Sequence, residues 1–99
     1  MIRIAFDVDG TLIYSEGQEH PADTPRYEVI ALFKSLYLCK DVQLYIWSGG
    51  GIDYALHWAE KLGLDEYIDD VIEKTAMPND IDICFDDENV KLGKVNIRI

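Results

Sequence analysis

The sequence predicts an α/β protein: one Rossmann-like, three-layer domain over residues 1–99, built on an open and mostly parallel sheet. Three observations predict this class. Segments with strand-like and helix-like hydrophobic periods alternate along the chain. Polar clusters follow the strand-like segments, where open parallel sheets bind their ligands. A length of 99 residues is enough for one core and too short for a second lobe.

The first half of the chain contains two strand-like runs and one helical run. Ile2–Phe6 is a short apolar strand that leads into Asp7. Residues 12–23 are mixed polar and predict a loop or short hairpin that could lie over the end of this strand. A proline at a favoured first position and apolar residues at helical spacing predict a helix over Pro25–Cys39. The β-branched and aromatic residues of Val42–Trp47 predict the second strand.

The second half continues the alternation. Ile52–Leu62 has a helical apolar face, which Gly63 ends. Val71–Ile72 is a brief apolar run, and Ile81–Phe85 is the clearest remaining strand. Val95–Ile99 alternates apolar and polar residues and predicts a terminal edge strand. This order predicts parallel strands joined by right-handed crossovers.

The composition limits the partners and the compartment. A formal charge of −10, from 19 acidic and 9 basic residues, would repel duplex nucleic acid and anionic membranes. No apolar run approaches the roughly 18 residues of a membrane span and no basic leader precedes one, so we expect a soluble, cytoplasmic protein. Cys39 and Cys84 lie in apolar contexts without metal-ligand spacing, which favours buried free thiols over a disulfide.

Asp7 and Asp9 are the strongest candidates for chemistry. Residues two apart on a strand share a face, so these carboxylates repel each other unless a cation or a proton intervenes. One carboxylate could then attack a substrate while the other moves protons. Asp-Gly is also a hairpin signal, and Asp-x-Asp-Gly occurs in calcium loops. The calcium-loop alternative fails at Ala5, which stands where the first ligand belongs.

Further polar groups follow the other predicted strands. Ser48 follows the second strand, Lys74 the short third one, and Asp86 and Asp87 the fourth. Carboxylates at neighbouring strand ends can hold a hard cation, whereas a hydroxyl, a lysine and glycine amides can hold an anion. Taken alone, Ser48 is equally compatible with a helix cap and Lys74 with a solvated surface lysine. Lys61 is a rival lysine, but it falls inside a helical pattern.

These four clusters resemble the four motifs of the haloacid dehalogenase superfamily of phosphotransferases. Asp7-Val8-Asp9-Gly10-Thr11 resembles the first motif, Ser48 the second, Lys74 the third and Asp86-Asp87 the fourth. The resemblance spans nearly the whole chain, and residues 62–74 are similar to the stretch that leads into the family's lysine. It implies the family's fold without a cap domain, because neither gap between motifs is long enough for one. Residues 12–23 would then be the only available lid.

The resemblance also implies a Mg²⁺-dependent phosphatase. Asp7 would be the nucleophile that forms an aspartyl-phosphate, and Asp9 would protonate the leaving oxygen and later deprotonate the attacking water. Mg²⁺ would be held by Asp7, the backbone carbonyl of Asp9 and Asp86, while Asp87 would act on that shell through water or hydrogen bonds.

The same resemblance implies a set of phosphate-binding groups. Ser48 would hydrogen-bond a phosphoryl oxygen, together with Thr11 and the amides of Gly49 and Gly50. Lys74 would neutralise both the phosphoryl group and the nucleophile. His20 and His57 match none of the four motifs and are expected to be surface or loop residues.

The identity of the phosphorylated substrate stays open at this stage. A phosphoprotein, a nucleotide or a sugar phosphate would each suit a site without a cap, and a homo-oligomer or a bulky substrate could close it. Two alternatives keep the scaffold and change the function: a phosphoacceptor signalling domain of the receiver type, and a Mg²⁺-binding interaction module without turnover. In receivers the acidic pair follows the first strand and a single phosphorylated aspartate follows a later one. This chain would have the reverse order, with the nucleophile Asp7 after the first strand.

Overall fold

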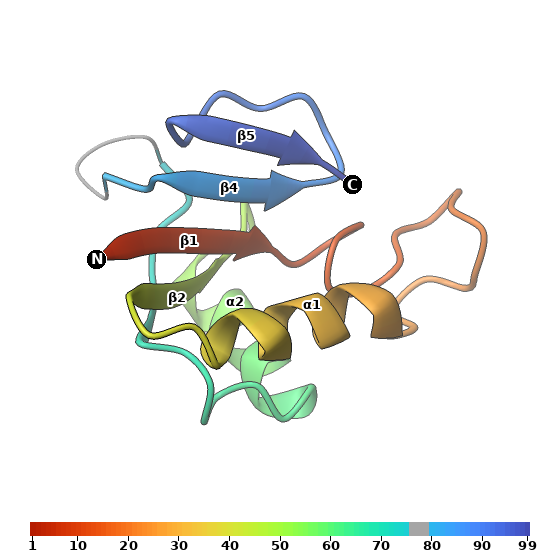
Figure 1. The fold of residues 1–99 in the computed structure, drawn as a ribbon. Coiled ribbons are helices and arrows are strands. Elements are labelled where there is room, and N and C mark those ends of the chain that lie inside the picture. Colours follow the sequence, from red (N-terminus) through yellow and green to blue (C-terminus); the bar gives the residue numbers. More distant parts are fainter. Residues whose placement is uncertain (76–79) are drawn as a thin grey trace.

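The computed structural model describes residues 1–75 and 80–99, which form a five-stranded sheet and two helices (Figure 1). In chain order the elements are β1 (Ile2–Asp7), α1 (Tyr27–Tyr37), β2 (Val42–Trp47), α2 (Ile52–Lys61), β3 (Asp70–Val71), β4 (Ile83–Asp86) and β5 (Val95–Arg98). The strand order is β3-β2-β1-β4-β5, and every neighbouring pair is parallel. The predicted α/β class with a parallel sheet is confirmed.

The central strand β1 determines where the candidate site lies. It pairs with β2 along its whole length and with β4 from Ile4 to Phe6. Ala5 and Phe6 are fully buried, as expected for a parallel strand covered on both faces. Because all strands run in the same direction, their carboxyl ends share one edge of the sheet, and Asp7 lies in the middle of that edge.

Both helices of the described residues lie on one face of the sheet, close to β2 and away from β5 (Figure 1). They share one hydrophobic cluster with β1 and β2 that includes Phe6, Phe33, Ile46 and Trp58. The chain moves from β1 to β2 to β3 in one direction, so right-handed crossovers put both helices on the same side. No described helix covers the opposite face, which is instead packed by residues outside the helices and strands, namely Ile72, Ile81, Val90 and Leu92. The predicted three-layer arrangement therefore lacks a second layer of helices in the described part of the chain.

The first helix is shorter than predicted, because the chain before it is tied into a small hairpin. Pro25 forms an antiparallel bridge with Ile13, and the Tyr14 N–H donates to the Thr24 carbonyl oxygen at 2.8 Å. The backbone at Pro25 is therefore extended, and α1 begins at Tyr27. Residues 12–23 thus form the loop of a short hairpin, as predicted, and its base is anchored by Leu12 and Ile13, which are fully buried.

The strand predictions agree closely with the structure. Val42–Trp47 is β2 to the residue, and the brief apolar run at Val71 forms the end of β3. β4 begins at Ile83 and ends at Asp86, so it starts two residues later than the predicted strand and ends one residue later. The terminal strand forms one edge of the sheet, as predicted, and the structure shows that it pairs with β4 of the same chain.

The two cysteines differ in environment. Cys84 is a fully buried free thiol on β4, and burial raises its pKa to about 12, so it stays protonated. Cys39 is free but exposed, so the expectation that it is buried was wrong. It follows the last turn of α1, where no element covers it, and its Sγ lies 3.9 Å from the Ser35 carbonyl oxygen. No helix in the described part of the chain is both long and apolar enough to cross a membrane.

Candidate functional site

A cavity of about 300 Å³ opens at the carboxyl edge of the sheet, where β1, β2 and β4 end. Its lining contains seven of the residues singled out in the sequence and two others; the nine are Asp7, Asp9, Ser15, Gly49, Gly50, Lys74, Asp86, Asp87 and Glu88. Ser15 belongs to the hairpin loop, so the segment predicted as a lid reaches the rim of this cavity. The candidate residues that follow four different strands are therefore neighbours in space.

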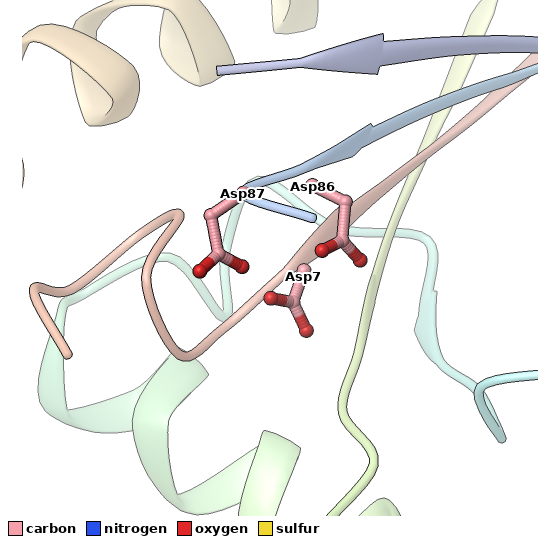
Figure 2. Close-up of side chains that lie close together, drawn as sticks. All are labelled: Asp7, Asp86 and Asp87. Atoms are coloured by element: carbon pink, nitrogen blue, oxygen red, sulfur yellow. The ribbon is translucent and has the colours of Figure 1, made fainter. Parts of the chain in front are cut away.

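Three carboxylates converge in this cavity (Figure 2). Asp7 is the last residue of β1, Asp86 is the last residue of the adjacent β4, and Asp87 follows it. One oxygen from each carboxylate lies within 4.8 Å of the other two. Asp7 and Asp86 are buried and Asp87 is half-buried. A hard divalent cation prefers such clustered oxygen ligands, so these three residues could hold one.

Lys74 supplies the positive charge that this cluster needs. Its Nζ lies 2.9 Å from Oδ1 of Asp7 and 2.8 Å from Oδ2 of Asp86. Burial alone disfavours the ammonium, but its contacts with Asp86 and Asp7 outweigh that effect and raise the pKa of Lys74. Three carboxylates against one ammonium still leave an excess of negative charge when all four groups are ionised. A bound divalent cation would offset that excess.

The nucleophile candidate Asp7 has a strongly perturbed pKa. Burial raises the pKa of Asp7 to about 7; the hydrogen bond to Lys74 lowers it in part, and repulsion from Asp86 and Asp87 raises it. Burial likewise raises the pKa of Asp87. A carboxyl with a pKa near neutrality at the end of a central strand is a frequent mark of a functional site, since evolution otherwise avoids burying such a group.

Asp9 also lines the cavity but does not belong to the three clustered carboxylates. Its Oδ1 accepts a hydrogen bond of 2.7 Å from the hydroxyl of Tyr54, which lies in the first turn of α2. The two carboxylates of the first motif therefore have separate surroundings, as the predicted division of roles requires. Asp7 contacts a lysine, whereas Asp9 contacts a phenol.

The candidate phosphate-binding groups divide into two sets. Gly49 and Gly50 line the cavity, and the Gly50 N–H donates to Oγ of Ser48 at 3.0 Å. Ser48 and Thr11 are buried and do not line the cavity themselves. The Thr11 hydroxyl lies 3.4 Å from Oδ2 of Asp7, to which it donates. In this structure Thr11 thus supports Asp7, and Ser48 supports the glycine loop.

Gly10 has a specific steric reason to be glycine. Its φ angle is +81°, and a Cβ at this position would collide with the carboxylate of Asp87. Its carbonyl oxygen accepts hydrogen bonds from Nη1 of Arg26 at 2.7 Å and from Nε2 of Gln18 at 3.3 Å. Two side chains from the hairpin region therefore hold the turn that carries Asp9.

The sequence reasoning missed five residues that complete the site: Ser15, Gln18, Arg26, Tyr54 and Glu88. Glu88 also donates its backbone N–H to Oδ1 of Asp86 at 3.0 Å. Glu88 directly follows Asp86 and Asp87, and this position was the signal in the sequence that could have identified it. Tyr54 and Arg26 act over long sequence separations and give no local signal. His20 and His57 are exposed, as predicted, and neither they nor Lys61 line the cavity.

A scan of the chain against models of known protein families, a search of curated proteins and a search of solved structures found no match. The fold and the site still define a class: an α/β protein with an acidic, lysine-containing cavity at the carboxyl edge of a parallel sheet. The activity of this protein therefore has to be inferred from the chemistry of the cavity.

Proposed function

We propose that the protein is a Mg²⁺-dependent phosphohydrolase of the haloacid dehalogenase type, which hydrolyses phosphomonoesters through an aspartyl-phosphate on Asp7. One observation carries the proposal: a buried carboxylate, a second carboxylate with a separate partner, a lysine and two further carboxylates all meet in one cavity. This set matches what phosphoryl transfer needs, namely a nucleophile, a proton carrier and charge neutralisation.

In the first step an oxygen of Asp7 would attack the phosphorus of the substrate. The bond between phosphorus and the leaving oxygen breaks, and its electron pair goes to that oxygen. The proton of Asp9 moves to the same oxygen, so the alcohol leaves neutral and Asp9 becomes a carboxylate. The Lys74 ammonium, 2.9 Å from Oδ1 of Asp7, favours the ionised nucleophile against the effect of burial and attracts the phosphoryl oxygens.

In the second step Asp9 would take a proton from water, and the water oxygen would attack the phosphorus. The bond from phosphorus to the Asp7 oxygen breaks, and its electron pair restores the Asp7 carboxylate. Inorganic phosphate then leaves, and Asp9 is protonated for the next cycle. Asp9 suits this double role because it lines the cavity without belonging to the three clustered carboxylates.

The cluster of Asp7, Asp86 and Asp87 fits a divalent cation, because all three offer oxygen atoms within 4.8 Å of one another and, among the described residues, Lys74 is the lysine that pairs with them. These residues would hold Mg²⁺, together with the backbone carbonyl of Asp9. When bound, Mg²⁺ would neutralise charge on the carboxylates and on the phosphoryl group. Asp86 is held ready by the backbone N–H of Glu88.

The deciding experiment is phosphate release from p-nitrophenyl phosphate and from glycerol 3-phosphate, with and without Mg²⁺. We expect Mg²⁺-dependent release by the native chain and none by Asp7→Asn. Asp9→Asn should lose about a hundredfold or more on the alkyl ester, the usual contribution of general acid catalysis. Asp65→Asn, which changes an exposed carboxylate outside the cavity, is the matched control and should leave turnover unchanged.

Two results would contradict the proposal. If the native chain binds Mg²⁺ in calorimetry and releases phosphate from neither ester, the interaction module becomes the better description. If instead an acyl phosphate accumulates on Asp7 and persists, the phosphoacceptor signalling function is favoured. We further propose a cytoplasmic setting with a phosphorylated small molecule or protein as partner, which suits two free thiols and a charge of −10.

A further inference from the structure

The hydroxyl of Tyr54 contacts Asp9 although Tyr54 lies outside the cavity lining. It donates a hydrogen bond of 2.7 Å to Oδ1 of Asp9, while Tyr54 itself does not line the cavity. Tyr54 can therefore affect a substrate through Asp9.

The ring of Tyr54 is held in place by the loop that follows β2. A Cβ built on Gly50 would lie 3.0 Å from Cδ2 and 3.1 Å from Cγ of that ring, so the glycine lets the loop and the ring pack closely. The other end of the side chain is attached to the first turn of α2. Tyr54 thus links the glycine loop to Asp9 through a fixed aromatic ring.

We propose that Tyr54 is a positioning residue that assigns different tasks to the two oxygens of Asp9. Because Oδ1 is occupied by the phenol, Oδ2 is the oxygen that carries the proton to the leaving group and later accepts one from water. This inference rests on the proposed function. It goes beyond it by naming a residue, outside the four motifs and outside the cavity, that orients the acid.

Leaving groups that need a proton provide the test. The kcat/KM of an enzyme reports only the steps up to the first irreversible one, here the formation of the aspartyl-phosphate. Glycerol 3-phosphate needs a proton on its leaving oxygen, whereas p-nitrophenolate leaves without one. Tyr54→Phe should therefore lower kcat/KM for glycerol 3-phosphate about tenfold and leave kcat/KM for p-nitrophenyl phosphate nearly unchanged. A role in folding alone would lower both values equally.

Two further variants sharpen the experiment. In an Asp9→Asn background, Tyr54→Phe should add no further loss on glycerol 3-phosphate, because the inference has Tyr54 act through Asp9. Tyr27→Phe removes a hydroxyl from a side chain that is 72% exposed and should change neither value. Circular dichroism would confirm that each variant is folded, and Tyr54→Leu, which removes the same hydroxyl, provides an independent test if Tyr54→Phe is not.

The outcomes separate this inference from the proposed function. If the native chain hydrolyses both esters and Tyr54→Phe impairs both to the same extent or neither, Tyr54 does not orient Asp9 and the inference alone is overturned. If the native chain hydrolyses neither ester, the proposed function fails and this inference fails with it. Selective loss on glycerol 3-phosphate in Tyr54→Phe, with no loss in Tyr27→Phe, supports it.

Discussion

Nζ of Lys74 lies 2.9 Å from Oδ1 of Asp7, and the side chains are 18% and 6% exposed. The same ammonium lies 2.8 Å from Oδ2 of Asp86, so one lysine from the loop after β3 joins the ends of β1 and β4. Lys74 therefore contributes both to the stability of the folded chain and to the proposed chemistry. Both contributions can be measured.

Replacing Lys74 by methionine keeps its length and removes its charge. Asp7 and Asp86 would then be buried without their cation, and breaking a buried ion pair in this way costs roughly 3–5 kcal/mol. We expect a clearly lower Tm for Lys74→Met in the presence of a chelator, with partial recovery on adding Mg²⁺, and no phosphate release. Thermal unfolding with and without Mg²⁺ measures this.

The matched control for Lys74 is Lys61→Met, because Lys61 was the rival lysine in the sequence. Its Nζ lies 4.8 Å from the centre of the Trp58 ring on α2, outside the cavity. We expect this variant to keep full turnover and nearly full stability. Loss of turnover in Lys61→Met, with activity retained in Lys74→Met, would transfer the proposed role to Lys61.

Mg²⁺ binding should depend on pH around neutrality. With an Asp7 pKa of about 7 in the metal-free protein, protons compete with the cation for this carboxylate at pH 6 and hardly at pH 8. If Asp7 must be ionised to bind, the apparent affinity for Mg²⁺ should be about tenfold weaker at pH 6 than at pH 8. Isothermal titration calorimetry at the two pH values tests this; equal affinities would remove Asp7 from the ligand set.

The stability of the metal-free protein should fall as pH rises. The Asp7 carboxyl binds a proton up to a pH of about 7 in the folded chain but only to about 3.8 in the unfolded one. Its stabilising effect is therefore complete below the unfolded pKa and is lost as pH rises through about 7, at a cost of at most about 4 kcal/mol. Burial raises the pKa of Asp87 too, which acts in the same direction.

Chelator-treated samples between pH 5 and pH 8 would reveal this loss. We expect the Tm of the native chain to decrease more steeply over that range than the Tm of Asp7→Asn, because asparagine carries no titrating group. Asp65→Asn, at an exposed position, should follow the native curve. A native curve parallel to that of Asp7→Asn would mean that Asp7 is ionised throughout.

The general plan of the molecule could be predicted because its signals are local. Val42–Trp47 is rich in β-branched and aromatic residues and stops at Ser48 and a glycine run, so both ends of β2 were visible. The position of polar residues after successive strands predicted one shared edge, and Asp7, Lys74 and Asp86 do meet there. Parallel topology alone accounts for that part of the site.

The remaining contacts depend on tertiary packing that no local pattern encodes. The start of α1 shifted because Pro25 bridges to Ile13, a contact across a hairpin loop. The bond from Tyr54 to Asp9 requires α2 to begin just beyond the glycine loop and the ring to pack on Gly50. Likewise, Arg26 donates a hydrogen bond to the Gly10 carbonyl oxygen, and these two residues lie close together only in the folded chain.

Substituting Gly10 should damage the site through Asp87. Gly10→Ala adds the strain of a positive φ, about 1 kcal/mol, and a Cβ that collides with the Asp87 carboxylate. Gly17→Ala is a matched control, since Gly17 has a similar φ of +88° and nothing lies within 4 Å of its added Cβ. We expect both variants to lose about the same backbone stability, while Gly10→Ala loses more in total and also loses Mg²⁺ affinity. Comparing the two variants by urea unfolding and by calorimetry separates the effect of the collision with Asp87 from the effect of the positive φ. Equal Mg²⁺ affinities in the two variants would mean that the place of Asp87 beside Gly10 does not matter for the cation.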